Sequence, residues 1–269
     1  MIREKCFNSN ISSNFQAILE LKNDQHKKLF TFHFSLFTPI FFLILFPLLW
    51  ATPFSHPSNV IPGNMNTNNP FNYLALGDSY SIGESILLAD NFPSQLIAIL
   101  NEEAPFWQPA RIVAKTGWTT EELQEGIAAA QKNELLLSRY DFVTLLIGVN
   151  DQYRGRTVEE YKPKFEALLQ QAIQFAGNKA EQVLVISIPD WGVTPYANGR
   201  DIEQIGREID AFNAANKKIA LQYQVPYLNI TSWTREAATD ATLLAADGLH
   251  PSGKEYKRWA EKIAEMIKK

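Results

Sequence analysis

The sequence after Pro70 alternates short apolar runs with longer segments of helical periodicity, and this alternation constrains the fold more than any other feature. Five runs have the length and composition of buried β-strands: 71–76 (FNYLAL), 110–114 (ARIVA), 142–147 (FVTLLI), 182–188 (QVLVISI) and 225–230 (VPYLNI). Apolar strands separated by helices form a parallel sheet that is covered on both faces. We therefore expect one three-layer α/β/α domain with a five-stranded parallel sheet.

Helix signals lie between these runs. Apolar residues recur at helical spacing in two segments: Leu168, Leu169 and Ile173, and Ile202, Ile205, Ile209 and Phe212. Three hydroxyl residues are followed three positions later by Glu, which is the pattern of a capping box: Thr119 with Glu122, Thr157 with Glu160, and Ser252 with Glu255. These pairs predict where three of the helices begin.

An apolar segment without formal charge precedes the predicted domain. Residues 29–51 would cover roughly 34 Å as a helix, which is enough to cross a bilayer. Lys27 and Lys28 lie directly before it, so the positive-inside rule predicts a cytoplasmic N-terminus and an extracytoplasmic domain, periplasmic or secreted. Leu49 is not the small residue that a signal-peptidase site has two positions before Ala51, which favours an uncleaved anchor. We expect four parts: a cytoplasmic segment (1–28), a signal peptide or transmembrane anchor (29–51), a Pro- and Asn-rich linker (52–70) and the folded domain (71–269).

Charge and composition exclude several functions for this domain. Residues 70–269 contain 26 acidic and 20 basic side chains, a formal charge of −6, which argues against nucleic-acid binding. The only cysteine, Cys6, precedes the apolar segment, and His250 is the only histidine after residue 56. A disulfide, a cysteine nucleophile and a zinc site of His and Cys ligands are therefore excluded, whereas an all-carboxylate Mg or Ca site stays open. We expect no cofactor.

Polar motifs follow the predicted strands at the edge where sites form in parallel sheets. They are GDSY (77–80), KTGW (115–118) and GVND (148–151) after the first three runs, and DGLHP (247–251) near the C-terminus. Each motif alone is typical of a turn or a helix cap. Together they bring a hydroxyl, amide groups and an Asp/His pair to one edge, which favours an active site.

This combination resembles the SGNH hydrolases, also called the GDSL lipase and esterase family, over most of residues 71–269. The family's four marker residues are matched by Ser79, Gly117, Asn150 and His250, and its acidic residue by Asp247. The wider phrases, such as ALGDSYSIGES and LLIGVNDQYRG, are similar to a bacterial branch of lysophospholipases and related esterases. The resemblance implies a flavodoxin-like fold and ester hydrolysis without a metal or other cofactor.

The roles of these residues follow from acyl transfer. Ser79 needs a base to accept its proton, and His250 is the only imidazole in the domain. Asp247 is expected to orient the ring, with Asp240 as the weaker candidate. The oxyanion hole is expected to consist of the backbone amides of Ser79 and Gly117 and the side-chain amide of Asn150.

The expected substrate is a small-molecule or lipid ester, and lysophospholipid is the first candidate by resemblance, followed by an acetylated glycan or a thioester. Candidate substrate-binding residues are Tyr80, Trp118 and Trp191, and Tyr80 stands where the family most often has Leu. Arg154 and Arg156 are expected to be solvated or to contact an anionic head group. Two other functions remain open, an acyltransferase that passes the acyl group to a sugar or lipid hydroxyl and a catalytically silent envelope-binding module. The sequence predicts no particular oligomeric state.

Overall fold

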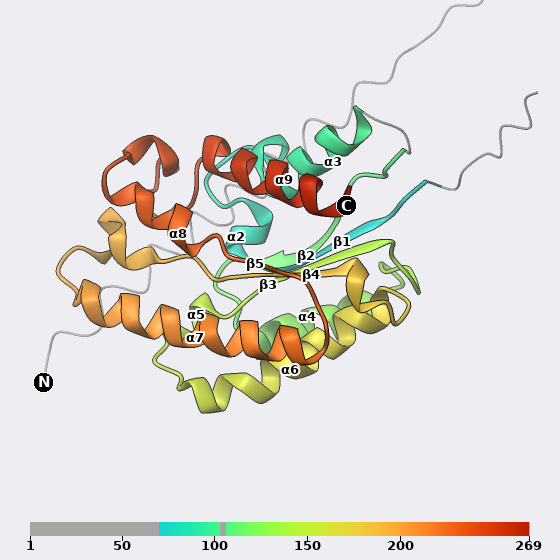
Figure 1. Cartoon of the computed structure of the whole chain (residues 1–269), viewed down its shortest axis with the longest axis horizontal. Helices are drawn as coiled ribbons and strands as arrows, with labels where there is room; N and C mark the ends of the chain where they lie inside the picture. Colours follow the sequence, from blue (N-terminus) through green and yellow to red (C-terminus); the bar gives the residue numbers. More distant parts are fainter. Residues whose placement is uncertain (1–69, 103–105, 269) are drawn as a thin grey trace, which may run out of the picture. The chain divides into compact units, whose positions relative to one another are not determined.

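A computed structural model of the chain describes residues 70–102 and 106–268 (Figure 1). The expected cytoplasmic segment, the apolar segment 29–51 and the linker up to residue 69 lie outside the described residues. Among the residues that are described, no helix has the length and apolar character needed to cross a bilayer.

The five expected strands form one parallel sheet. In chain order they are β1 (Tyr73–Asp78), β2 (Arg111–Lys115), β3 (Phe142–Leu146), β4 (Val183–Ile186) and β5 (Tyr227–Leu228). All pairings are parallel, and the strand order is β2-β1-β3-β4-β5. This is the flavodoxin-like order, so the predicted sheet and fold class are confirmed.

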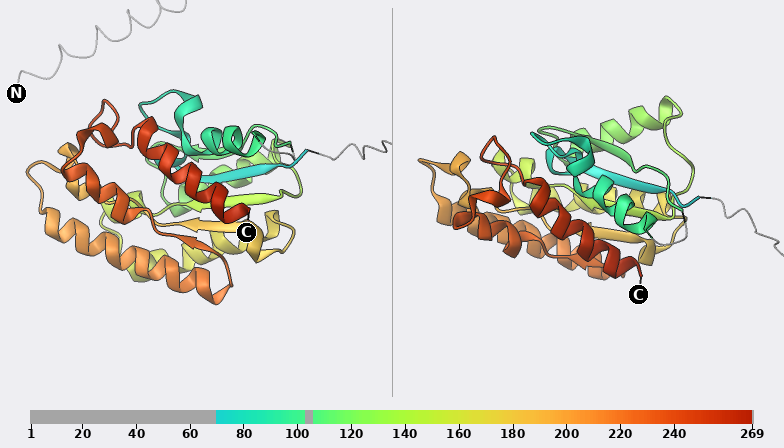
Figure 2. Two further views of the ribbon diagram at one scale, coloured as in Figure 1. Left: turned by 45° about the horizontal axis from the view of Figure 1, so that its top comes forward. Right: turned by 90° about the horizontal axis from the view of Figure 1, so that it is seen from above.

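Helices cover both faces of the sheet, as Figures 1 and 2 show. One face carries α3 (Phe92–Asn101) and α9 (Gly253–Ile267), which pack side by side, and the other carries α4 (Thr120–Lys132), α6 (Val158–Phe175) and α7 (Ile202–Gln222). Three helices of four or five residues occur at the ends of strands or in loops: α2 (Ser79–Ile82), α5 (Val149–Tyr153) and α8 (Thr231–Thr234). Short 3₁₀ turns occur at Leu88–Asp90, Ala180–Gln182, Trp191–Val193, Pro195–Ala197, Arg235–Ala238 and Ala241–Leu243.

The core explains why the strand runs are mostly apolar. Every residue of β1, β3 and β4 is buried, whereas β2 at the sheet edge is partly exposed. On α7, Ile205, Ile209 and Phe212 are buried as their spacing predicts. Ile202 in the first turn is 56% exposed, because the helix begins at this residue, before the part that packs on the core.

Two of the three predicted capping boxes are confirmed, at Thr119 and at Thr157. The third forms only in part. The Ser252 hydroxyl accepts from the Glu255 amide, but the Glu255 carboxylate turns inward and accepts from Trp259 Nε1 at 2.8 Å. A buried carboxylate needs hydrogen-bond donors inside the protein, and the Glu255 carboxylate accepts hydrogen bonds from Trp259 and Arg258. The helix α9 still begins where the pattern predicts.

Candidate active site

Ser79 lies at a tight turn from strand to helix. It is the first residue of α2 and follows β1 directly, and the Asp78 side chain caps the helix by accepting from the Tyr80 amide at 3.0 Å. A Cβ at position 77 would come within 2.0 Å of Ser81 Oγ and 2.5 Å of the Leu146 carbonyl oxygen, so only glycine fits there. The sharp turn presents the Ser79 hydroxyl at the carboxyl edge of the sheet.

His250 and Asp247 form a direct pair. Asp247 Oδ2 lies 2.6 Å from His250 Nδ1, and Oδ1 of the same carboxylate accepts from the backbone amides of Leu249 and His250 at 3.0 Å each. The four-residue loop therefore fixes both the position of the carboxylate and the orientation of the ring. With Nδ1 donating to Asp247, the other ring nitrogen, Nε2, is free to act as a base.

Asp247 is ionised at neutral pH. Partial burial disfavours its charged form, but hydrogen bonds from His250, Leu249 and Ser85 outweigh burial and lower its pKa to about 2. The Ser85 hydroxyl donates to Asp247 Oδ2 at 2.7 Å, a contact that sequence reasoning missed because Ser85 is 162 positions away. The weaker candidate, Asp240, instead accepts from Thr242 and pairs with Lys254 at 3.0 Å.

Gly117 and Asn150 approach each other through the turn after β2. Gly117 has a φ of 82°, a left-handed conformation that favours glycine, and its N–H donates to no residue in the described parts of the chain. Asn150 lies on α5 after β3, and its Nδ2 donates to the Trp118 carbonyl at 3.0 Å. One of the two Asn150 amide hydrogens thus holds this turn, and the other remains available.

A pocket of about 80 Å³ brings together Ser79, Asn150 and His250, whereas Gly117 and Asp247 are not part of its lining. Its lining consists of Ser79, Tyr80, Val149, Asn150, Tyr153, Trp191, Tyr196, Leu249 and His250. Ser79 and His250 thus face one cavity, although no hydrogen bond joins their side chains in the described structure. We name this cavity the active-site pocket.

Two predicted substrate residues, Tyr80 and Trp191, lie in this pocket. The Tyr80 ring packs on the His250 ring with centroids 4.9 Å apart, and Trp191 is held by a hydrogen bond from Nε1 to Gln152 at 2.7 Å. Sequence reasoning missed Tyr153 and Tyr196, whose hydroxyls are 3.2 Å apart. Tyr153 lies three residues after Asn150 on α5, a helical spacing that could have indicated it, whereas nothing in the sequence marks Tyr196.

Trp118, the third predicted substrate residue, does not line the active-site pocket. Its indole lies against Gly126 of α4, where an added Cβ would come within 2.1 Å of the ring. Trp233 is also elsewhere, with the Arg258 guanidinium 5.5 Å from its ring centroid. Arg156 is not a free surface cation, because it pairs with Asp151 at 3.3 Å and with Glu121 at 2.7 Å.

Asp78, beside Ser79, has an unusual electrostatic environment. Burial, followed by the nearby charge of Asp151, raises the pKa of Asp78 to about 7, against the hydrogen bond from the Tyr80 amide. Its Oδ2 is buried without a hydrogen-bond partner. The histidine content of the sequence does not indicate this second group with a pKa near neutrality, because the shift of Asp78 arises from burial. In the described residues, no cluster of three or more His, Cys, Asp or Glu side chains could hold a metal ion.

Residues 75–258 match the sequence model of the GDSL-like lipase/acylhydrolase family. The chain belongs to this family. Its members are carboxylic ester hydrolases, and so is this protein. No curated protein is significantly similar to it in sequence.

Solved structures share the fold at low sequence identity. A lipase/acylhydrolase from Enterococcus faecalis is 20% identical with a TM-score of 0.55, covering 74% of this chain and 95% of its own. The esterase EstA from Pseudoalteromonas sp., in a structure inhibited by monoethylphosphonate, is 19% identical with a TM-score of 0.54 and coverages of 73% and 96%. A mutant of Axe2, an acetyl-xylooligosaccharide esterase from Geobacillus, is 18% identical with a TM-score of 0.54 and coverages of 73% and 94%.

Proposed function

We propose that this family member is a serine esterase that works through an acyl-enzyme on Ser79. Ser79 Oγ attacks the ester carbonyl carbon while His250 Nε2 takes the hydroxyl proton. The resulting oxyanion accepts hydrogen bonds from the amides of Ser79 and Gly117 and from Asn150 Nδ2. When the intermediate collapses, His250 returns the proton to the departing alcohol. Water then attacks the acyl-enzyme in the same way and releases the acid.

One observation carries this proposal: the 2.6 Å contact between Asp247 and His250 at a pocket that Ser79 and Asn150 also line. The low pKa of Asp247 keeps its carboxylate charged, which stabilises the imidazolium that forms when Ser79 loses its proton. The Gly117 N–H, which has no acceptor among residues 70–102 and 106–268, and the second Asn150 amide hydrogen supply donors for the oxyanion. A nucleophile, an oriented base and oxyanion donors are the groups that acyl transfer needs.

Hydrolysis of p-nitrophenyl acetate by the Ser79→Ala variant tests the proposal. We expect activity to fall to the level of the uncatalysed reaction, because no other hydroxyl takes the place of Ser79. Ser81→Ala is the matched control, since it removes a buried hydroxyl without a hydrogen-bond partner two residues away on the same helix. Full activity in the control and more than a few per cent in Ser79→Ala would overturn the assignment of the nucleophile.

We also propose that residues 29–51 anchor the protein in a membrane with its catalytic domain on the extracytoplasmic side. The support is the uncharged apolar stretch and the two lysines before it. Cys6 allows a direct test because it is the only cysteine. A membrane-impermeant maleimide should label it only after cells are permeabilised. Labelling of Cys6 in intact cells would show the opposite orientation, and loss of Cys6 from the mature protein would show cleavage.

A further inference from the structure

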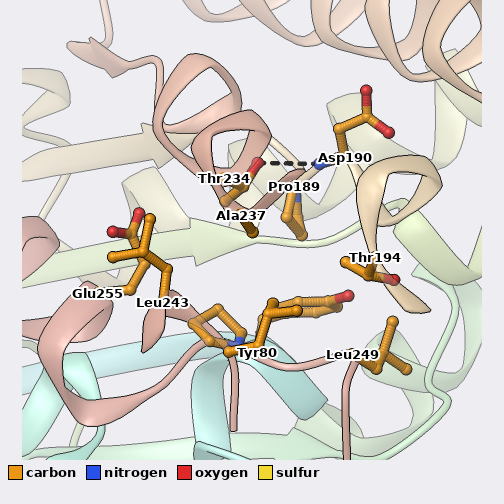
Figure 3. Close-up of a pocket in the computed structure, with 11 residues that line it drawn as sticks. Tyr80, Pro189, Asp190, Thr194, Thr234, Ala237, Leu243, Leu249 and Glu255 are labelled. Atoms are coloured by element: carbon orange, nitrogen blue, oxygen red, sulfur yellow. Dashed lines mark hydrogen bonds between the residues drawn. The ribbon is translucent and has the colours of Figure 1, made fainter. Parts of the chain in front are cut away.

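Tyr80 separates two cavities. The active-site pocket lies on one side of it, and on the other lies a smaller cavity whose lining includes Pro189, Thr194, Ala237, Leu243, Leu244 and Pro251 (Figure 3). We name this second space the inner cavity. Only Tyr80 and Leu249 line both cavities. These two side chains are therefore the wall between them.

The Tyr80 side chain is held in place at this wall. It is 3% exposed, its amide donates to Asp78 at 3.0 Å, and its ring packs on His250. Figure 3 shows the ring lying across the inner cavity, with its hydroxyl directed toward Thr194 and Leu249. Because the ring is packed on several sides, it does not open by a simple rotation.

The sizes of the two spaces limit what each can hold. The inner cavity has about 10 Å³, which is about the least that accommodates a single water molecule. The active-site pocket has about 80 Å³. A chain of several methylenes bound to Ser79 therefore has no room beyond Tyr80 while the ring is present. Without the ring, the two spaces would form one largely apolar channel.

The sheet topology indicates which part of an ester occupies the active-site pocket. The pocket lies on the β3 and β4 side of Ser79, where Val149, Trp191 and Leu249 give it apolar walls. On the β2 side, Thr116 hydrogen-bonds to Glu84, and the loop that carries Glu84 also exposes Leu87 and Leu88. An acyl chain gains free energy where it leaves water, so it binds in the active-site pocket, where Val149 and Trp191 are buried, and the alcohol departs on the other side of Ser79.

We propose that Tyr80 sets the acyl-chain length of the substrate and makes this enzyme selective for esters of short acids, from acetyl to butyryl. The inference rests on the proposed acyl-enzyme at Ser79. It departs from the lysophospholipid substrate that the family resemblance implied, because a pocket of about 80 Å³ with Tyr80 in its wall does not enclose the long acyl chain of a lysophospholipid.

Rates with p-nitrophenyl acetate, butyrate and octanoate test this proposal in the full chain, with active sites counted by fluorophosphonate labelling. For the unchanged enzyme we expect kcat/KM to fall at least tenfold from butyrate to octanoate. Tyr80→Ala should raise the octanoate-to-acetate ratio at least tenfold, since each methylene that leaves water contributes about fourfold. Tyr80→Phe keeps the ring and should keep the original ratio.

Two further variants separate an opened channel from a general loosening of the site. Leu249→Ala opens the same wall and should also raise the octanoate-to-acetate ratio, which preserves the test if Tyr80→Ala does not fold. Adding Ala237→Leu to Tyr80→Ala refills the inner cavity and should lower the ratio again. Equal rates on acetate and octanoate in the unchanged enzyme would overturn the proposal, as would an active Tyr80→Ala with an unchanged ratio. Absence of both hydrolysis and Ser79 labelling would instead reject the proposed function itself.

Discussion

Arg154 donates a hydrogen bond from Nη2 to the carbonyl oxygen of Gly117 at 2.6 Å. The same guanidinium pairs with Glu122 at 3.1 Å, in the first turn of α4. It therefore ties the end of α5 to the turn after β2, which carries one of the proposed oxyanion donors. Arg154 is partly solvated, as expected from the sequence, and in addition it holds the Gly117 turn.

Arg154→Ala should lower kcat with little change in KM, because a displaced Gly117 amide matters mainly once the oxyanion has formed. We expect kcat to fall about tenfold, which is less than the loss expected when an oxyanion hydrogen-bond donor is itself removed. Steady-state kinetics with p-nitrophenyl acetate measure both constants. Arg207→Ala is the control, since Arg207 is an exposed residue of α7 that pairs only loosely with Glu203, at 3.7 Å. An unchanged kcat in Arg154→Ala would show that Arg154 does not position the Gly117 turn for catalysis.

The sequence predicts the sheet and the identity of the candidate catalytic residues, because both depend on local patterns. The runs that became β1 and β3 are apolar except for Asn72 and Thr144, because these strands are buried on both faces. Asp247 and His250 are three residues apart, so their contact could be anticipated from a short loop. Ser79 follows its strand directly, and the edge on which it lies then follows from the parallel topology.

The rest of the site depends on contacts between distant segments. Ser85 reaches Asp247 across 162 positions, and nothing near Ser85 in the sequence indicates this. Trp118 was a candidate for the pocket or for packing in the core, and its ring packs on Gly126 in the second turn of α4, a contact that the motif after β2 does not indicate. The raised pKa of Asp78 likewise requires the burial that the surrounding elements provide.

Asp247→Asn should lower kcat/KM by about four orders of magnitude, because the amide neither fixes the ring in the required tautomer nor stabilises the imidazolium. Asp240→Asn is the matched control. Asp240 is an acidic residue seven positions earlier that caps a 3₁₀ turn and pairs with Lys254, so its loss should leave activity within about twofold of the original. Similar losses in both variants would mean that Asp247 acts through the stability of the loop.

Asn150→Ala should lower kcat by about 10²-fold to 10³-fold and leave KM nearly unchanged, as expected for the loss of one oxyanion donor. The variant also loses the hydrogen bond to the Trp118 carbonyl. Asn150→Asp separates the two effects, since it keeps the size of the side chain but places a negative charge beside the oxyanion. It should be no more active than Asn150→Ala. A change confined to KM would assign Asn150 to binding of the substrate.

We expect the free energy of unfolding to fall as pH rises from about 4 to about 7, because over this range Asp78 is largely protonated in the folded protein and ionised in the unfolded chain. Its pKa is about 7 in the folded protein, against 3.8 for the exposed group, so the folded state holds the proton more tightly and loses stability as the proton leaves. Asp78→Asn keeps the oxygen that caps α2 and removes this ionisation. Urea unfolding at pH 4.5 and pH 8 should show a smaller loss of stability in the variant, with a difference on the order of 2–4 kcal/mol. Parallel pH dependence of the two proteins would show that Asp78 does not ionise in this range.

The central claim is that Ser79 is the nucleophile that His250 activates. Labelling of the full chain with a fluorophosphonate, followed by peptide mass spectrometry, tests it most directly, because the reagent forms a stable bond only with an activated serine. We predict one adduct per chain, on Ser79, that is absent from Ser79→Ala, strongly slowed in His250→Gln and unchanged in Ser81→Ala. An adduct on another residue, or equal labelling of Ser79→Ala and the unchanged protein, would contradict the account.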